Sequence, residues 1–122
     1  MTEYKFLDSS IWLEYFHNRK YSNIIESKEV ILLSILSIFE IKRKLIKEKY
    51  EKNKITRAIE FIKKRSLIIP INEEISEKAA EISAEKNLPA IDSLIYSSAI
   101  LNNAKLFTQD NDFNGLKEVV LL

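Results

Sequence analysis

Short hydrophobic runs alternate along the chain with longer segments in which hydrophobic residues recur every three or four positions. The run Val30–Leu33 is continuous, which is typical of a strand buried on both faces of a parallel sheet. Four further runs have the length and the polar borders of strands. The predicted strands are Tyr4–Leu7, Val30–Leu33, Leu67–Ile69, Lys105–Thr108 and Val119–Leu121.

Helical periodicity fills most of the chain between these runs. Ile38, Ile41 and Leu45 recur at helical spacing, which predicts a long amphipathic helix that ends near Tyr50. Pro89 favours the start of the last helix, whose small residues suit close packing against a sheet. Besides the long helix, the predicted helices are Ile11–Phe16, Ile55–Lys64, Glu73–Lys86 and Ile91–Leu101.

This alternation predicts one α/β domain over residues 1–122, a three-layer α/β/α sandwich around a mainly parallel sheet of four to five strands. A single glycine excludes Gly-rich phosphate loops, and the lack of cysteine excludes disulfides and thiolate zinc sites. No stretch resembles a membrane span or a signal peptide, so we expect a cytoplasmic protein without membrane contact. The net charge of +1 reflects mixed acidic and basic residues and does not by itself indicate nucleic-acid binding.

Four acidic residues fall where an open α/β sheet binds ligands, beyond the carboxyl ends of its strands. Asp8 directly follows the first predicted strand, and Asp110 follows a late one. We expect Glu40 in the first turn of the helix after the second strand, and Asp92 in the first turn of the helix that Pro89 opens. The sequence therefore predicts that these four acids meet at one edge of the sheet.

Taken singly, each of these acids is better explained by local structure. The segment Ser37–Glu40 matches a capping box, in which Glu40 accepts a hydrogen bond from the backbone N–H of its first residue. Asp92 suits the dipole of a helix N-terminus, while Asp8 and Asp110 suit turns or caps. Only their expected meeting at one edge of the sheet favours a shared function.

Carboxylates held together repel one another and raise one another's pKa unless a cation neutralises them. Because the chain has no cysteine and only one histidine, its oxygen ligands favour a hard ion, Mg²⁺ or Mn²⁺. Such ions polarise phosphates and lower the pKa of bound water. The pattern therefore indicates phosphodiester hydrolysis.

With these residues in view, the chain resembles the PIN-domain ribonucleases found as VapC toxins of toxin–antitoxin pairs. The resemblance spans nearly the whole chain and rests on the order and spacing of four segments. These segments are Phe6–Ile11, Ser37–Arg43, Leu88–Ile95 and Leu106–Phe113. Lys44 and Asn102–Ala104 depart from the pattern, because many relatives have glycine there, but neither departure removes an acid.

The resemblance implies a metal-dependent endoribonuclease that requires Mg²⁺ or Mn²⁺. The catalytic, metal-binding acids that it implies are Asp8, Glu40, Asp92 and Asp110. It further implies that Ser10 and Thr108 orient acids or waters, and that Asp112 replaces or assists Asp110. Similar proteins cleave RNA, form homodimers and are silenced by a cognate antitoxin that inserts a segment into the active-site groove, so we expect these partners here.

Other residues have both a functional and a structural interpretation. A basic helix face either lines an RNA path or is a solvated surface, and its Arg43 stands one turn from Glu40. His17 fits a surface or capping residue better than a general base, because it lies away from every acid. An aromatic group suits either the core or a surface for a dimer or an antitoxin. The basic residues are Lys42, Arg43, Lys44, Lys47 and Lys49, and the aromatic ones are Trp12, Tyr15, Phe16 and Tyr21.

Three alternatives stay open at this point. One is a PIN-like RNA-processing nuclease without an antitoxin. Another is a phosphoacceptor receiver domain, which requires an acid pair after the first strand, whereas Asp8 is followed by Ser9 and Ser10. The third is a non-catalytic PIN-like binding module, which has no need for a costly cluster of like charges.

Overall fold

A parallel five-stranded sheet forms the centre of the computed structural model, which describes residues 3–122. Its strands are β1 (Tyr4–Leu7), β2 (Ile31–Ser34), β3 (Leu67–Ile69), β4 (Ala104–Thr108) and β5 (Val119–Leu121). Their order is β3-β2-β1-β4-β5, and every pair is parallel. The predicted α/β fold and its parallel sheet are thus confirmed, and the receiver-type order 2-1-3-4-5 is not the one observed.

The strand order places a topological switch point between β1 and β4. From β1 the chain adds β2 and β3 on one side, and β4 and β5 extend the other side. Ligands of open α/β sheets bind outside the carboxyl ends of the strands at such a point. Asp8 follows β1 and Asp110 lies just beyond β4, so two of the predicted acids stand at this switch point.

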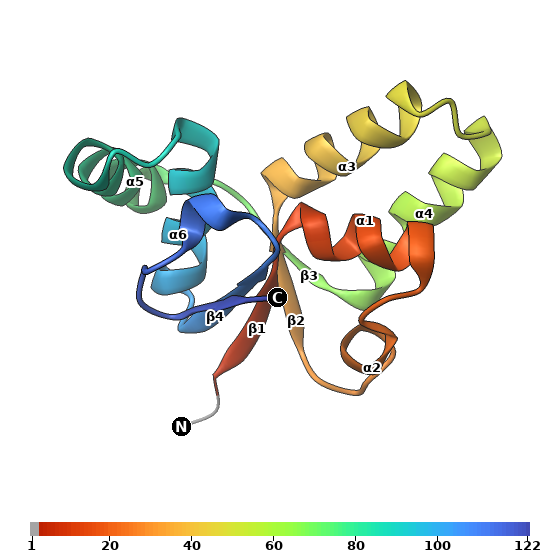
Figure 1. Ribbon diagram of the computed structural model, residues 1–122, viewed down its shortest axis with the longest axis horizontal. Coiled ribbons are helices and arrows are strands. Elements are labelled where there is room, and N and C mark those ends of the chain that lie inside the picture. The colour runs from red at the N-terminus through yellow and green to blue at the C-terminus, as the bar shows by residue number, and fades with distance from the viewer. Residues whose placement is uncertain (1–2) are drawn as a thin grey trace.

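Helices cover both faces of the sheet, with α1, α3 and α4 grouped on one side and α5 and α6 on the other (Figure 1). Their bounds are α1 (Ser9–Asn18), α2 (Ser22–Ile25), α3 (Ile35–Lys47), α4 (Lys52–Arg65), α5 (Glu73–Lys86) and α6 (Ala90–Leu101), with a 3₁₀ helix at Asn111–Phe113. We call the first group with its core the α1–α4 side, and the second with its core the α5–α6 side. These are the outer layers of the predicted sandwich.

Successive residues of β1 supply the two cores, because side chains alternate between the faces of a strand. Leu7 packs into the core of the α1–α4 side with Trp12 and Ile62, while Phe6 packs into that of the α5–α6 side with Ile95 and Phe113. All six side chains are fully buried. The carboxyl end of β1 is thereby buried on both faces, and Asp8, which follows it, lies at the edge between the two layers.

The main departures from the sequence expectations concern helix ends. The long helix begins at Ile35 and is capped by Ser34, whose hydroxyl accepts the N–H of Leu36 at 3.1 Å, so the predicted capping box at Ser37 is wrong. It ends at Lys47 rather than near Tyr50, because Lys49 adopts a left-handed conformation with φ of 61°. The short helix α2 was not predicted from the sequence pattern. Within residues 3–122, no helix is long and apolar enough to cross a bilayer.

Candidate active site

Asp8 is the most buried of the four predicted acids. It precedes α1 in an extended conformation, and its carboxylate does not cap that helix. Instead its Oδ2 accepts a hydrogen bond of 2.7 Å from the hydroxyl of Thr108 and one of 3.2 Å from Ser10. Burial raises the pKa of Asp8, and these two hydrogen bonds partly oppose the rise. The two hydroxyls that the sequence singled out both contact Asp8.

Thr108 also shapes the loop that carries Asp110. Its Oγ1 accepts the backbone N–H of Asp110 at 3.0 Å, while the N–H of Gln109 donates to the hydroxyl of Ser10 at 3.1 Å. One hydroxyl therefore joins Asp8, at the end of β1, to the segment after β4. Asp110 in turn accepts the N–H of Asp112 at 2.9 Å, which begins the 3₁₀ helix.

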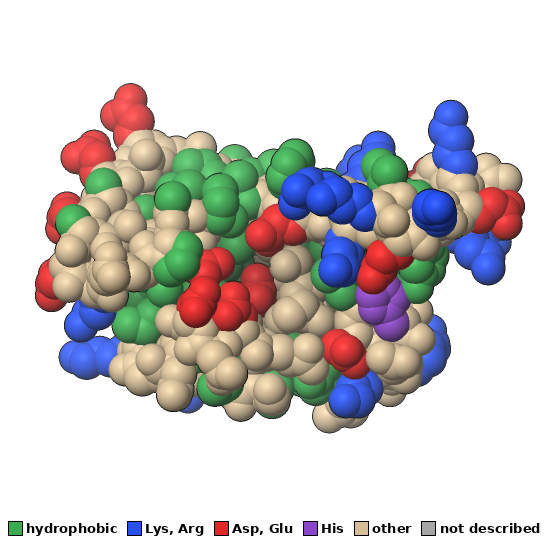
Figure 2. All heavy atoms as spheres, turned by 45° about the horizontal axis from the view of Figure 1, so that its top comes forward, with side chains coloured by type: hydrophobic (Ala, Val, Ile, Leu, Met, Phe, Trp, Pro, Cys, Tyr) green, Lys and Arg blue, Asp and Glu red, His purple; other side chains and the backbone are tan. Residues whose placement is uncertain are grey.

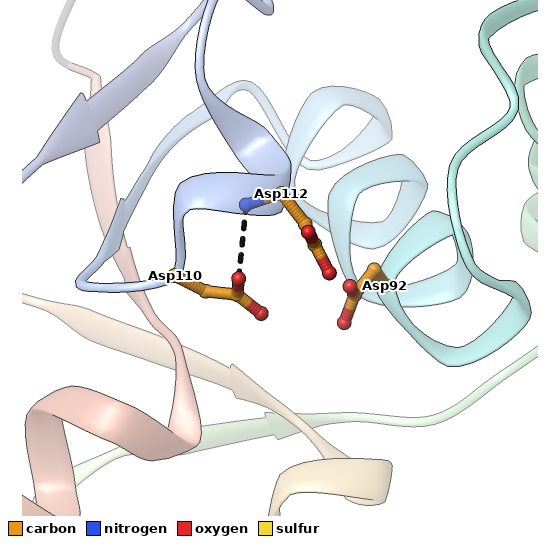
Figure 3. A group of neighbouring side chains, drawn as sticks. All are labelled: Asp92, Asp110 and Asp112. Carbon is orange, nitrogen blue, oxygen red and sulfur yellow. Dashed lines mark hydrogen bonds between the residues drawn. The ribbon is translucent and has the colours of Figure 1, made fainter.

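Asp92 faces Asp110 and Asp112 across a short gap. It lies in the first turn of α6, as predicted, after Pro89 at the N-cap position. One carboxylate oxygen from each of the three acids lies within 4.8 Å of those of the other two. Figure 3 shows the three side chains converging from α6 and from the loop after β4. Asp112 therefore joins Asp110 in the group rather than replacing it.

Glu40 lies in the second turn of α3, because the helix begins earlier than the sequence pattern indicated. Its carboxylate is not used in a capping box, and its Oε1 is buried without a hydrogen-bond partner among residues 3–122. Burial raises the pKa of Glu40, and the charges of Asp8 and Asp110 raise it further. A buried carboxylate oxygen without a partner needs a donor or a cation.

The mutual repulsion of the group is strongest at Asp92. Burial and the neighbouring charges of Asp110, Asp8, Asp112 and Glu40 raise its pKa to about 7. All four predicted acids and Asp112 are thus brought within electrostatic reach of one another. The donors are carboxylate oxygens only, and one of them lacks a partner, so the residues fit a hard divalent cation.

Several other residues named from the sequence do not join this group. Arg43 is exposed on α3, one turn beyond Glu40. His17 pairs with Glu48 at 2.9 Å and packs near the ring of Tyr50, away from the acids. The aromatic group belongs mainly to the core: Trp12 and Tyr15 are buried, and the other two residues are partly buried against them.

One contact beside the site was missed from the sequence. The side-chain amide of Gln109 donates to the hydroxyl of Tyr21, which ties the loop of Asp110 to the segment before α2. Tyr21 reaches this position because its backbone is left-handed, with φ of 63°. No sequence pattern marks a tyrosine for that conformation, since bulky residues rarely adopt it.

The sequence also matches a known family over most of its length. The model of the PIN domain matches residues 5–119. The chain belongs to the PIN-domain family. Among curated proteins, no sequence matches this PIN domain.

Solved structures share the fold of this PIN domain at low sequence identity. A toxin–antitoxin complex from Klebsiella pneumoniae contains a chain with 22% identity and a TM-score of 0.79, over 95% of both chains. VapBC2 from Rickettsia felis, bound to a promoter DNA fragment, matches with 22% identity and a TM-score of 0.75, over 97% of this chain and 96% of that one. VapC20 from Mycobacterium tuberculosis, described as a toxin that cleaves the sarcin–ricin loop, matches with 15% identity and a TM-score of 0.72, over 93% and 95%.

Proposed function

We propose that this PIN domain is a metal-dependent endoribonuclease and the toxin of a toxin–antitoxin pair. The observation that carries the proposal is the convergence of five carboxylates, with a buried oxygen of Glu40 that lacks a partner. Family membership and the toxins among the structurally similar proteins support RNA as the substrate. Such an enzyme would act in the cytoplasm, where its RNA substrates are.

In this proposal Asp8, Glu40, Asp92 and Asp110 hold Mg²⁺ or Mn²⁺, with Asp112 beside them. The bound ion would supply Lewis acidity toward the phosphodiester. Thr108 and Ser10 would orient the carboxylate of Asp8 for the ion through their hydrogen bonds to its Oδ2. The exposed Asp112 marks the side that is open to solvent and substrate.

The experiment measures cleavage of a labelled single-stranded RNA by purified protein with Mn²⁺, with Mg²⁺ and with EDTA. We expect Asp92→Asn and Glu40→Gln to lower the cleavage rate by more than about a hundredfold, since even outer-shell substitutions at metal sites cost 10–100-fold. Glu81→Gln, an exposed change on α5, is the matched control and should cleave normally. Cleavage that survives EDTA or Asp92→Asn contradicts the proposal.

For the antitoxin we propose a docking place between α1 and α4. A cavity of about 320 Å³ there has an aromatic floor of Tyr15, Phe16 and Phe61, with the rings of Tyr15 and Phe61 stacked at 5.9 Å. Its basic rim consists of Arg19, Lys54 and Arg57. An acidic segment with apolar side chains fits both features. Arg57→Glu should weaken capture of the protein encoded by the adjacent reading frame, whereas Lys63→Glu on the same helix should not.

For the homodimer we propose the outer face of α3 as the contact. Ile35, Phe39 and Ile46 are all exposed, and Phe39 retains 65% of its surface. Their spacing of four and seven residues sets them in one stripe along the helix. Sedimentation of wild-type protein and Phe39→Glu tests this contact: a dimer that persists in the variant contradicts it.

A further inference from the structure

Charge is divided unevenly between the two sides of the molecule. Residues 1–65, which include the three helices of the α1–α4 side and α2, hold 15 of the 19 Lys and Arg but only nine of the 18 acids. Residues 66–122, which form α5 and α6, hold the other four basic residues and nine acids. The near-zero net charge therefore hides a basic side and an acidic side, with the acidic site between them.

Helix α3 leads from the acidic site into the basic side. Arg43, Lys44 and Lys47 follow Glu40 by three, four and seven residues, so all three lie on the side of the helix that carries Glu40. They are exposed, and none forms an ion pair with another residue in 3–122. We call these three residues the α3 track. It extends about 10 Å along the helix axis from Glu40.

Lys42 and Lys49 do not belong to this track. Lys42 lies on the outer face of α3, between the exposed side chains of Phe39 and Ile46. Lys49 stands beyond the helix in a left-handed turn. The five basic residues that the sequence grouped together are thus separated by the geometry of the helix into three beside the site and two away from it.

A second acidic surface lies away from the site, on α5 and near the carboxyl end of α6. Glu73, Glu74, Glu77 and Glu81 of α5 line a surface hollow, with Lys78 as its one basic residue. Figure 2 shows Lys and Arg side chains directly beside the central acidic group on the α3 side, whereas hydrophobic and then acidic side chains cover the other side. The cations beside the acidic group therefore lie on the α3 side, whereas the surface of α5 does not attract a polyanion.

We propose that the α3 track binds the phosphates of single-stranded RNA on one side of the scissile bond, and so sets the direction in which the substrate crosses the site. This inference rests on the proposed ribonuclease function. One row of cations on one helix face matches one sugar–phosphate backbone, with each residue in reach of a phosphate. Phosphate contacts of this kind fix the register of a nucleic acid and carry no base specificity.

The test compares two double variants that lower the net charge equally. Arg43→Gln with Lys47→Gln removes two residues of the track, and Lys63→Gln with Lys64→Gln removes two exposed charges of α4 outside it. Binding of a fluorescein-labelled 12-nucleotide single-stranded RNA is measured by anisotropy in EDTA, where metal-dependent cleavage is blocked. The acidic group is unchanged in every variant. Its repulsion of the RNA phosphates is therefore the same in both double variants and does not affect the comparison between them.

We expect the track variant to bind the RNA about tenfold more weakly than wild type. The slope of log affinity against log salt concentration should become shallower by about 0.7 for each phosphate contact that is lost. The control variant should lose less than about twofold. Equal losses in the two variants, or no measurable affinity of wild-type protein for the RNA, overturn the inference. So does a track variant that binds RNA normally but no longer dimerises, because the track would then contact protein.

Cleavage with Mn²⁺ is measured separately, which distinguishes this inference from the proposed function. If wild-type protein binds RNA through the α3 track but cleaves no RNA, the proposed function is wrong and the inference about RNA binding is retained. If wild-type protein cleaves RNA but the two double variants bind RNA equally well, the inference about the α3 track is wrong and the proposed function is retained. For the track variant under the proposal, KM should rise about tenfold while kcat changes little, because the track does not touch the reacting phosphate.

Discussion

The two sides of the sheet bury their cores with different kinds of side chain. The α1–α4 side packs large residues such as Trp12, Ile41 and Ile62, and its surface is basic. The α5–α6 side depends on α6, where Ser97, Ser98 and Ala99 are fully buried, and its surface is acidic. Small residues let α6 approach β4 and α5 closely. On the other side, bulky side chains fill the space between the helices and the sheet, so the backbones make fewer close contacts.

Neither side holds the acidic site alone. Asp8 directly precedes α1 and Glu40 lies in α3, while Asp92 lies in α6, and Asp110 and Asp112 follow β4. Thr108 joins Asp8 to Asp110 by two hydrogen bonds, and Ser10 joins Asp8 to the neighbouring Gln109. The acidic site therefore forms where the two sides of the molecule meet. Its geometry depends on how both sides pack against the central strands.

The largest effect should come from the core of the α1–α4 side. Ile62→Ala leaves a cavity among bulky neighbours, and we expect a loss of about 2–5 kcal/mol in the free energy of unfolding. Leu67→Ala removes the same number of atoms from a side chain that is 59% exposed, and should change the stability by less than about 0.5 kcal/mol. Urea unfolding measures both. Similar losses for the two variants would contradict the packing described for this side.

A smaller effect is expected where the two sides are joined. Thr108→Val keeps the shape of the side chain but removes the donor to Asp8 and the acceptor for the N–H of Asp110. Because both partners would lose a buried hydrogen bond, we expect a loss of about 1–3 kcal/mol in stability. Metal affinity, measured by calorimetry with Mn²⁺, should fall by about 10–100-fold.

The control for this variant is Thr56→Val on α4. The hydroxyl of Thr56 is exposed and donates only to the carbonyl of Lys52 in its own helix. Its loss should leave metal affinity unchanged and alter stability by less than about 0.5 kcal/mol. Unchanged Mn²⁺ affinity in Thr108→Val would show that the two sets of acids are positioned without Thr108.

The charge of the acidic group should make stability depend on pH. The pKa of Asp92 is about 7 in the folded protein and near 3.8 in the unfolded chain, so the folded state binds more protons between these values. Without metal, the stability contributed by this group is therefore lost as the pH rises from about 4 to about 8. Asp92→Asn should be more stable than wild type by about 1–2 kcal/mol at pH 8, with solvent screening allowed for, and equal to it at pH 4.

Thermal unfolding of both proteins across this pH range measures the difference. Mn²⁺ should stabilise wild type and remove the advantage of Asp92→Asn, because a bound cation offsets the repulsion that the substitution relieves. A variant that is less stable than wild type at pH 8 without metal would contradict the electrostatic description of the site.

The smallest effect is expected in the core of the α5–α6 side. The hydroxyl of Ser97 is buried without a hydrogen-bond partner among residues 3–122. Ser97→Ala should therefore leave stability unchanged or raise it by up to about 1 kcal/mol. Ser93→Ala, whose hydroxyl donates to the carbonyls of Leu88 and Pro89, should instead cost about 1 kcal/mol. Chemical denaturation distinguishes the two, and equal losses would contradict this comparison.

Much of the fold was predictable because its signals are local. Continuous hydrophobic runs mark the strands to within about one residue, since a strand buried on both faces tolerates few polar side chains. The first turn of α6, with Pro89 and Asp92, was also placed correctly from the sequence. The start of α3 was misplaced because Ser34 and Ser37 both resemble caps. In the structure Ser34 accepts the N–H of Leu36, whereas Ser37 is buried inside the helix.

By itself the sequence determined the parallel α/β layout, the acids that follow its strands and the absence of thiolate or Gly-rich chemistry. These follow from residue type and short-range periodicity. Tertiary structure alone decided that Asp112 joins Asp110, that Thr108 connects Asp8 to the late loop, and that only three of five neighbouring basic residues flank the site. Each of these facts depends on the approach of segments up to 100 residues apart in sequence, or on the rotation of a helix about its axis. Such relations arise only when both sides pack on the same sheet.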